Sequence, residues 1–202
     1  MTGLGSTRAF VVVGVLSSLA FSSQGPTGSS GAEPSDGHVS DGIYVNKFFG
    51  FSYRIPRGLI PQSTESTNFK QHRIDPSRPP TKNFVLFLAA APVKPYKNVA
   101  MNAASASDFK DGAAYLKKTA LVSTVIGLTV LNDPEQKTFA GMTFFRQDYY
   151  SPQGPFYQTH VCTVYRGYAL DFIISASNRE DIDPLFKSLN TLRFEAPVDG
   201  VH

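Results

Sequence analysis

Three polar residues in the last third of the chain have the types and the spacing of a general acid–base group. Asp148, His160 and Asp171 lie on three consecutive β-prone runs joined as hairpins. Neighbouring strands of such a meander can place a carboxylate beside an imidazole, the arrangement that orients a general base. Polar residues on the solvent side of a half-exposed sheet give the same pattern. We favour this second interpretation, assign no catalytic residue, and expect His160→Ala to leave the fold intact and to abolish no activity.

Cys162, the single cysteine, lies two residues from His160 and therefore on the same strand face. A reactive thiol needs an exposed, electropositive setting, whereas a position inside a β-run indicates a small buried residue. The histidines show none of the spacings typical of metal sites, and the sequence has no phosphate-binding glycine loop following a strand. We therefore expect no metal and no cofactor, and we favour a protein without enzymatic activity.

Aromatic residues surround the loop SPQGP at a predicted hairpin tip. Tyr149 and Tyr150 precede this loop, and Phe156 and Tyr157 follow it. Aromatic side chains gathered at a tip can anchor a protein partner. They also form cross-strand pairs inside sheets, so the sequence leaves both interpretations open.

A basic stretch occupies residues 68–83. Its candidate binding residues are Lys70, Arg73, Arg78 and Lys82. Only Asp75 offsets them, and three prolines in the stretch bar regular structure. Such a loop can meet an acidic surface or an anionic polymer, or it can be a solvated loop without a partner. The net charge of the chain, +3, is too small to indicate nucleic-acid binding.

The elements that position these residues follow from the periodicity of apolar side chains. Leu170–Ala176 alternates as a strand, and the next segment has the S-x-x-E spacing of a capping box at Ser177 and Glu180. Apolar residues then recur at three- and four-residue steps, which is typical of a helix with one apolar face. These residues are Ile182, Leu185, Phe186 and Leu189. A helix packed on a sheet is the expected result.

Upstream, the sequence predicts a strand pair over residues 43–56 and a central strand over 84–91. A second helix is predicted over Ser105–Thr124, capped by Ser105 or Ser107, with an apolar face formed by Phe109, Ala113, Leu116 and Ala120. Gly112 is expected to weaken that helix by about 1 kcal/mol relative to alanine. The predicted class is α+β, with helices on one or both faces of a mainly antiparallel sheet.

The ends of the chain differ in composition from its centre. Arg8 precedes an apolar run that ends in small residues, the layout of a secretory signal peptide, which we place at residues 1–22. Residues 23–41 are rich in Ser, Gly and Pro and are predicted to be a disordered linker. A single domain is expected over 42–196, followed by a tail over 197–202. The signal predicts a secreted or periplasmic protein without a stable membrane span after cleavage.

Two segments resemble the PsbP-like family. The opening residues, from Tyr44–Val45–Asn46 through Phe49–Gly50–Phe51–Ser52–Tyr53 to Ile55–Pro56, are similar to its "Y-x-N … G-F-S-x-x-x-P" start. The end, from Asp171–Phe172 to Leu192–Arg193–Phe194, is similar to its closing strand, helix and "S-L-x-x-F" segment. The family commonly has a tryptophan soon after the proline, and this chain has none. The resemblance implies an α/β/α sandwich around an antiparallel sheet, and it carries over no metal or catalytic residue.

These observations favour an exported, non-enzymatic binding or accessory protein of the bacterial envelope or periplasm. Its expected partner is another protein or an envelope component. The alternatives are a small-ligand-binding protein or a hydrolase with a pocket near His160, and a structural component of a larger assembly. Fold resemblance by itself is a weak basis for choosing among them, because one fold hosts many functions.

Overall fold

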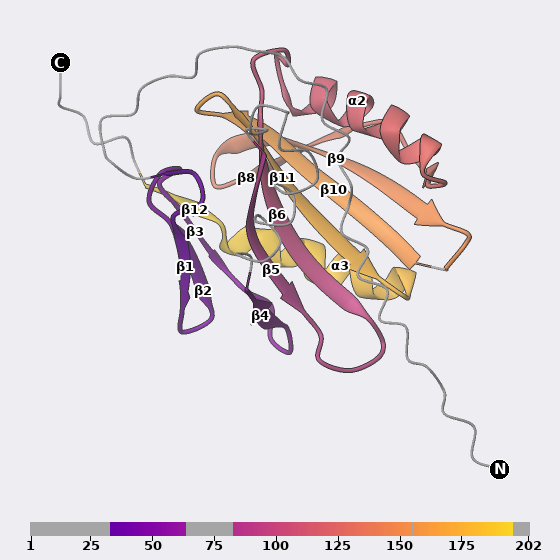
Figure 1. Cartoon of the computed structure of the whole chain (residues 1–202), viewed down its shortest axis with the longest axis horizontal. Coiled ribbons are helices and arrows are strands. Elements are labelled where there is room, and N and C mark those ends of the chain that lie inside the picture. Colours follow the sequence, from indigo (N-terminus) through magenta and orange to yellow (C-terminus); the bar gives the residue numbers. More distant parts are fainter. Residues whose placement is uncertain (1–32, 64–82, 155, 196–202) are drawn as a thin grey trace, which may run out of the picture.

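Two antiparallel sheets and two α-helices make up the described part of the chain (Figure 1). The computed structural model describes residues 33–63, 83–154 and 156–195. The predicted signal peptide, linker residues 23–32 and the tail lie outside these ranges. So do four candidate binding residues of the basic stretch, Lys70, Arg73, Arg78 and Lys82.

The large sheet contains eight strands. In spatial order they are β4 (Ile60–Gln62), β5 (Asn83–Ala90), β6 (Lys97–Ser105), β11 (Tyr168–Ala176), β10 (Phe156–Tyr165), β9 (Met142–Ser151) and β7 (Thr129–Val130), with β8 (Glu135–Phe139) also paired to β9. The small sheet has the order β1 (Gly37–Ser40), β2 (Ile43–Asn46), β3 (Phe51–Arg54) and β12 (Arg193–Phe194). The helices are α2 (Gly112–Val125) and α3 (Ile182–Lys187), with 3-10 turns η1 (Arg179–Asp181) before α3 and η2 (Ser188–Thr191) after it.

Strand β1 lies upstream of residue 42, where the domain was predicted to start. It lies inside the stretch assigned to the linker and pairs with β2 through a two-residue turn at Asp41–Gly42. Both turn residues have positive φ, 51° and 71°. Aspartate followed by glycine favours this kind of hairpin turn, so the folded region extends upstream of residue 42 despite its polar composition.

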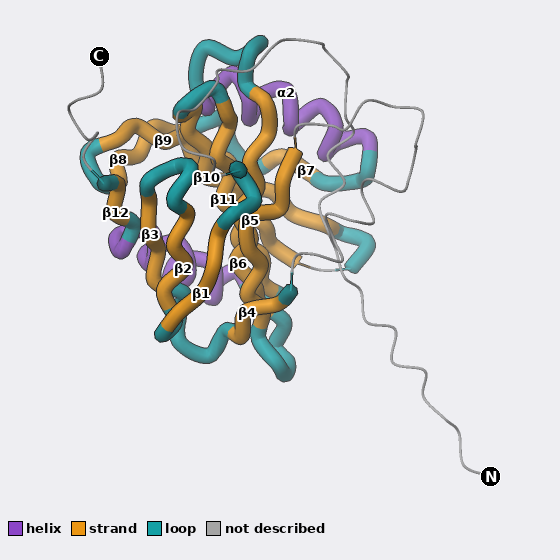
Figure 2. The backbone as a smooth tube through the Cα atoms, turned by 60° about the vertical axis from the view of Figure 1, so that its left-hand side comes forward, coloured by secondary structure: helices purple, strands orange, loops and turns teal. Residues whose placement is uncertain are grey.

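The main core lies between the large sheet, the small sheet and α3. Figure 2 shows β1, β2 and β3 lying across the large sheet. Aromatic rings fill this interface: the ring centroid of Tyr53 is 5.5 Å from that of Phe87 and 5.4 Å from that of Phe172. Ile182 and Leu185 of α3 join the same cluster. The predicted helix on a sheet is therefore confirmed, but it shares its side of the sheet with a second sheet that the sequence did not predict.

Helix α2 covers the opposite face of the large sheet. Val161 belongs to the main core, whereas Cys162, the next residue of β10, packs against Leu116 of α2 in a second cluster. Neighbouring residues of a strand point to opposite faces, so α2 and α3 lie on opposite sides of the sheet (Figure 1). The α+β class and the central antiparallel sheet are confirmed.

The start and the buried face of α2 differ from the prediction. Residues up to Ser105 belong to β6, and the helix begins only at Gly112, capped by Asp111, whose Oδ1 accepts a 2.8 Å hydrogen bond from the Ala114 amide. The buried residues are Gly112, Tyr115, Leu116, Thr119 and Ser123, so only Leu116 of the predicted apolar face is buried. This helix packs through hydroxyl-bearing side chains as well as Leu116, and the sheet face beneath it is also mixed, with Cys162 and Ala169 beside the His160–Asp171 pair.

The predicted capping box at the start of α3 does not form. Asn178 precedes η1, and no side chain caps that turn or α3. The Ser177 hydroxyl instead donates a 3.3 Å hydrogen bond to the carbonyl of Tyr96. This contact ties the end of β11 to the loop before β6, and the helix therefore starts later than its sequence signal indicates.

Buried tyrosines make the stability of the fold depend on alkaline pH. Burial raises the pKa of Tyr44 from 10.0 to about 12, although Asn46 donates a hydrogen bond to its hydroxyl. Between these two pH values the unfolded chain binds fewer protons than the folded one. The contribution of the protonated Tyr44 hydroxyl to the free energy of unfolding is therefore complete below pH 10. It is lost as the pH rises toward 12.

We expect urea denaturation to show this loss, and Tyr44→Phe to reduce the pH slope by up to about 1.4 kcal/mol per pH unit. Phenolate absorbance reports the titration directly, because the chain has no tryptophan. Complete phenolate formation near pH 10 in the folded protein would contradict this expectation.

Candidate functional site

The structure brings together two of the three predicted acid–base residues. The Nδ1 atom of His160 on β10 lies 2.8 Å from Oδ2 of Asp171 on β11. His160 is 4% exposed and Asp171 is 0% exposed. Asp171 lies directly opposite Cys162 in the strand register, so the carboxylate reaches His160 diagonally across the hairpin. This pair is buried, and it does not lie on the solvent side of the sheet, as the favoured interpretation of the sequence assumed.

Asp148 lies on the other face of the sheet and does not join this pair. It is opposite Thr159 in the register of β9 and β10. Its Oδ1 accepts hydrogen bonds from the Thr159 hydroxyl at 2.7 Å and from Nε of Arg146 at 2.9 Å. The predicted three-residue cluster is therefore divided between two sites on opposite faces, because Thr159 and His160 are neighbours in one strand.

Polar groups surround the His160–Asp171 pair beneath α2. The ring of Tyr149 meets that of His160 edge to face at 5.0 Å, and its hydroxyl donates a 2.8 Å hydrogen bond to Oε1 of Gln147. Asp171 Oδ1 and the Tyr115 hydroxyl are buried without a hydrogen-bond partner among the described residues. Burial raises the pKa of Tyr115 well above its usual value, and the charge of Asp171 raises it further.

The surroundings of Cys162 argue against nucleophilic chemistry at this pair. The thiol is buried, and its Sγ lies 3.7 Å from the carbonyl of Thr163. Burial raises the pKa of Cys162 well above its usual value, and the negative charges of Asp171 and Asp111 act in the same direction. The nucleophilic thiolate is therefore disfavoured, and a substrate would have no exposed reactive group to meet.

The aromatic residues of the predicted hairpin tip have different surroundings. Tyr150 and Tyr157 lie opposite each other on β9 and β10, with ring centroids 5.1 Å apart. Cross-strand pairing was one of the two interpretations of these aromatic residues, the other being a binding surface for a partner. Tyr149 is buried on the α2 side, whereas Phe156 is half-buried at the start of β10. The four side chains therefore do not form one exposed surface.

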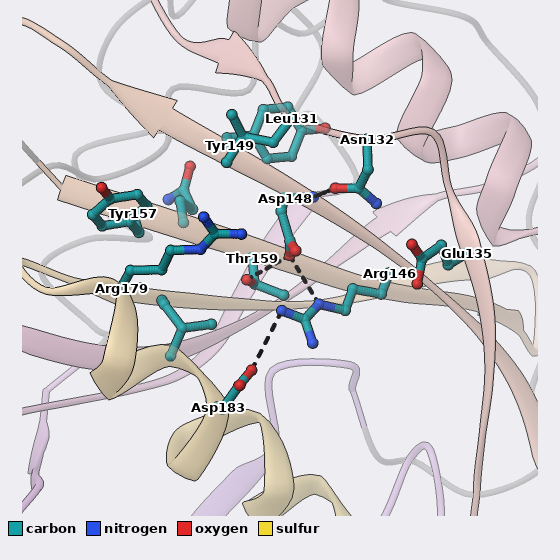
Figure 3. Close-up of a pocket in the computed structure, with 12 residues that line it drawn as sticks. Leu131, Asn132, Glu135, Arg146, Asp148, Tyr149, Tyr157, Thr159, Arg179 and Asp183 are labelled. Atoms are coloured by element: carbon teal, nitrogen blue, oxygen red, sulfur yellow. Dashed lines mark hydrogen bonds and ion pairs between the residues drawn. The ribbon is translucent and has the colours of Figure 1, made fainter.

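A polar groove lies on the α3 side of the sheet, beside Asp148 (Figure 3). It has a volume of about 350 Å³, within the range of ligand pockets. Its floor comes from β9 and β10, one wall from η1 and α3, and the other from the segment between β7 and β8. The residues that line this groove are Leu131, Asn132, Glu135, Arg146, Asp148, Tyr149, Tyr157, Gln158, Thr159, Arg179, Ile182 and Asp183.

Arg146 joins the floor of the groove to its α3 wall. Its guanidinium contacts Asp148 at 2.9 Å and Asp183 at 3.7 Å, and it lies over the ring of Phe186, 4.4 Å from the centroid. Only 17% of the Arg146 side chain is exposed. These contacts use both carboxylates and position α3 against β9.

The remaining wall is fixed by the segment between β7 and β8. The Asn132 side chain accepts a 2.9 Å hydrogen bond from the Asp148 amide, and the Asn132 carbonyl accepts one from the Gln147 side chain. The Leu131 amide donates to the carbonyl of Asp148. These bonds continue the edge of β9 between the two short strands and hold Asp148 in place.

Arg179 is a charged residue of the groove that makes no ion pair with another lining residue, whereas Asp148 and Asp183 share Arg146. Its side chain is directed into the groove from η1 (Figure 3). Asp148 and Asp183 pair with Arg146, and Glu135 pairs with Lys137 at 3.0 Å. Arg179 forms no ion pair or hydrogen bond through its side chain with the residues that the structure describes.

The sequence did not single out Arg146, Thr159, Arg179 or Asp183. Arg146 and Asp148 are two residues apart on one strand, which places them on the same face. If the register of the β9–β10 hairpin had been known, Thr159 could have been predicted as the residue opposite Asp148. No sequence pattern indicated that Arg179 belongs to this groove, because its position depends on how η1 packs against the sheet.

Among residues 33–63, 83–154 and 156–195, no three or more His, Cys, Asp or Glu side chains gather as a metal site would require. No helix in those ranges has the length and hydrophobicity needed to cross a membrane. His160 and Asp171 hold each other, and the acids of the groove pair with cations. The groove thus offers polar and charged side chains on its surface.

The comparisons with known proteins define the class of fold. No protein-family model and no curated protein matches the sequence. Among solved structures, the chain is similar to cyanobacterial PsbP (CyanoP) from Synechocystis, with 11% identity and a TM-score of 0.53, over 84% of this chain and 98% of that one. The predicted PsbP-like fold is therefore confirmed.

A second solved structure is LpqN, involved in cell envelope biogenesis of Mycobacterium tuberculosis. It is 13% identical, with a TM-score of 0.40, over 72% of this chain and 83% of that one. This similarity is too small to support a statement about fold or function. The PsbP similarity, at 11% identity, concerns the fold alone.

Proposed function

We propose that this chain is a non-enzymatic binding protein of the bacterial envelope or periplasm that holds a partner protein in the groove beside Arg179. The unpaired guanidinium of Arg179 carries the proposal. A guanidinium accepts a carboxylate with two parallel hydrogen bonds. Asp148 and Asp183 contact Arg146, and Glu135 contacts Lys137, so none of these carboxylates is bonded to Arg179, and we assign a carboxylate of the partner to it.

The remaining lining supports a protein partner. Tyr157 supplies an aromatic edge beside the polar floor, and Ile182 supplies an apolar surface in the α3 wall. Tyrosine and arginine are enriched at the energetic centres of protein interfaces. Because no described nucleophile is exposed beside His160, the alternative of a hydrolase has less support than binding. Export is the expectation from residues 1–22, and we include it in the proposal.

Arg179→Ala tests this assignment. A charge-assisted hydrogen bond contributes about 1.5–3 kcal/mol, which corresponds to a roughly ten- to hundredfold loss of affinity. The measurement uses the purified chain with photoreactive benzoylphenylalanine in place of Tyr157, exposed to the exported fraction of the producing cells. We expect discrete protein adducts that decrease at least about tenfold in Arg179→Ala.

Arg57→Ala is the matched control. Arg57 is also an exposed arginine without an ion pair among the described residues, but it lies in the turn after β3 and away from the groove. Adduct yields should be unchanged in this variant. Equal yields from the original chain and Arg179→Ala, or no adduct at position 157, would refute the assignment.

A further inference from the structure

Helix α2 buries polar side chains beside Leu116 and leaves large aliphatic side chains exposed, unlike an ordinary surface helix. Leu121 is 66% exposed, Val125 is 86% exposed and Ile126, at the end of the helix, is 50% exposed. On the inner face, Leu116 is buried together with Tyr115, Thr119 and Ser123 against the sheet. Packing within the chain therefore does not account for the large aliphatic residues on the outside.

Two lysines accompany this apolar face. Lys117 and Lys118 are exposed, and they precede Leu121 by four and three residues, so all three lie on the same side of the helix. Neither lysine forms an ion pair with another described residue, and α2 contains no acidic residue. The outer face of α2 thus combines uncompensated positive charge with exposed aliphatic side chains.

We propose that the outer face of α2, defined by Lys117, Lys118, Leu121, Val125 and Ile126, docks on a membrane surface that contains anionic lipids. Lysines attract such a surface, while aliphatic side chains enter the boundary between headgroups and acyl chains. Figure 1 shows α2 along the outside of the large sheet. A ridge of this kind fits a flat, deformable surface.

Charge also favours this occupant over a second copy of the chain. A contact between two α2 faces would gather four lysines with no acidic residue of α2 to pair with them, and like charges at an interface are unfavourable. The chain carries a net charge of +3, so its overall field does not oppose an anionic surface. The groove beside Arg179 is on the opposite face of the sheet and remains free when α2 is docked.

A fluorophore at position 125 reports docking of this face specifically. The variant Val125→Cys carries an environment-sensitive dye, and buried Cys162 stays unlabelled in the folded protein. We expect a blue shift on vesicles of phosphatidylglycerol and phosphatidylcholine, and none on phosphatidylcholine alone. In the Lys117→Ala/Lys118→Ala background, the apparent affinity should decrease about thirtyfold.

Val93→Cys is the control for membrane binding by other parts of the chain. Val93 is 73% exposed in the loop between β5 and β6, away from α2. The fluorescence of its dye should not shift.

The proposal is overturned by an absent shift at position 125, by an equal shift at position 93, or by undiminished affinity in the double lysine variant. A shift produced by polyglutamate but not by vesicles would also overturn it and would assign the face to an acidic protein. Arg179→Ala should leave vesicle binding unchanged, which separates this test from that of the groove.

Discussion

His160→Ala is expected to lower the free energy of unfolding by about 1–3 kcal/mol, the usual effect of leaving a buried polar group without its hydrogen-bond partner. Asp171 is 0% exposed. Among the described residues, its carboxylate makes one hydrogen bond, to His160. Its other oxygen, Oδ1, is already buried without a partner. Loss of the imidazole therefore leaves a buried carboxylate with neither oxygen bonded. Urea denaturation followed by circular dichroism measures the change.

Two further variants separate the causes of this loss. Asp171→Asn keeps an acceptor oxygen for His160 and removes the charge, so it should destabilise the fold less than His160→Ala does. His38→Ala removes an exposed histidine from the edge strand β1 and should change stability by no more than about 0.5 kcal/mol. If His160→Ala unfolded at the same urea concentration as the original chain, the pair would have no structural role.

Gly112→Ala is expected to destabilise the protein by about 1–3 kcal/mol, the range for overpacking a close contact. A Cβ atom at Gly112 would lie 2.2 Å from the carbonyl oxygen of Cys162 and 2.8 Å from its carbonyl carbon. Both are backbone atoms of β10, so they cannot rotate away. The first turn of α2 would have to move off the sheet, and its amide hydrogens should exchange faster.

The sign of this effect distinguishes close packing from helix propensity. Propensity alone predicts that Gly112→Ala stabilises α2 by about 1 kcal/mol. Gly154→Ala is the matched control, since a Cβ there meets no atom within 4 Å and its φ is not positive. Its stability should be close to that of the original chain. If Gly112→Ala raised the stability, the close approach of α2 to β10 would be refuted.

Strands and hairpins were the most predictable part of the fold because their signals are local. The meander of β9, β10 and β11 follows from alternating side chains, and the turn at Arg166–Gly167 was recognised as a tight turn. The Asp41–Gly42 turn carries an equally local signal, but the polar composition around it concealed β1. Strand β6 was missed because its alanines and asparagines indicate no strand until β5 and β11 pair with it on either side.

Helix α2 shows where periodicity misleads. Of the predicted apolar face, Phe109, Ala113, Leu116 and Ala120, only Leu116 is buried, and the larger Leu121 and Val125, outside that face, are exposed. The sheet face beneath α2 is mixed, with the His160–Asp171 pair beside Cys162 and Ala169, so polar and apolar side chains of α2 are buried together there. Which side of a helix is buried depends on the surface it meets, and that surface comes from distant segments of the chain.

The sequence by itself determined the α+β class, the antiparallel meander, the closing helix and the resemblance in fold, because periodicity and turn residues act over a few neighbouring positions. The tertiary structure alone decided that His160 meets Asp171 and not Asp148, and that Arg179 reaches the groove beside Thr159. Both outcomes depend on strand register and on the face to which each side chain points. A shift of one residue in register reverses that face without changing the local pattern of the strand.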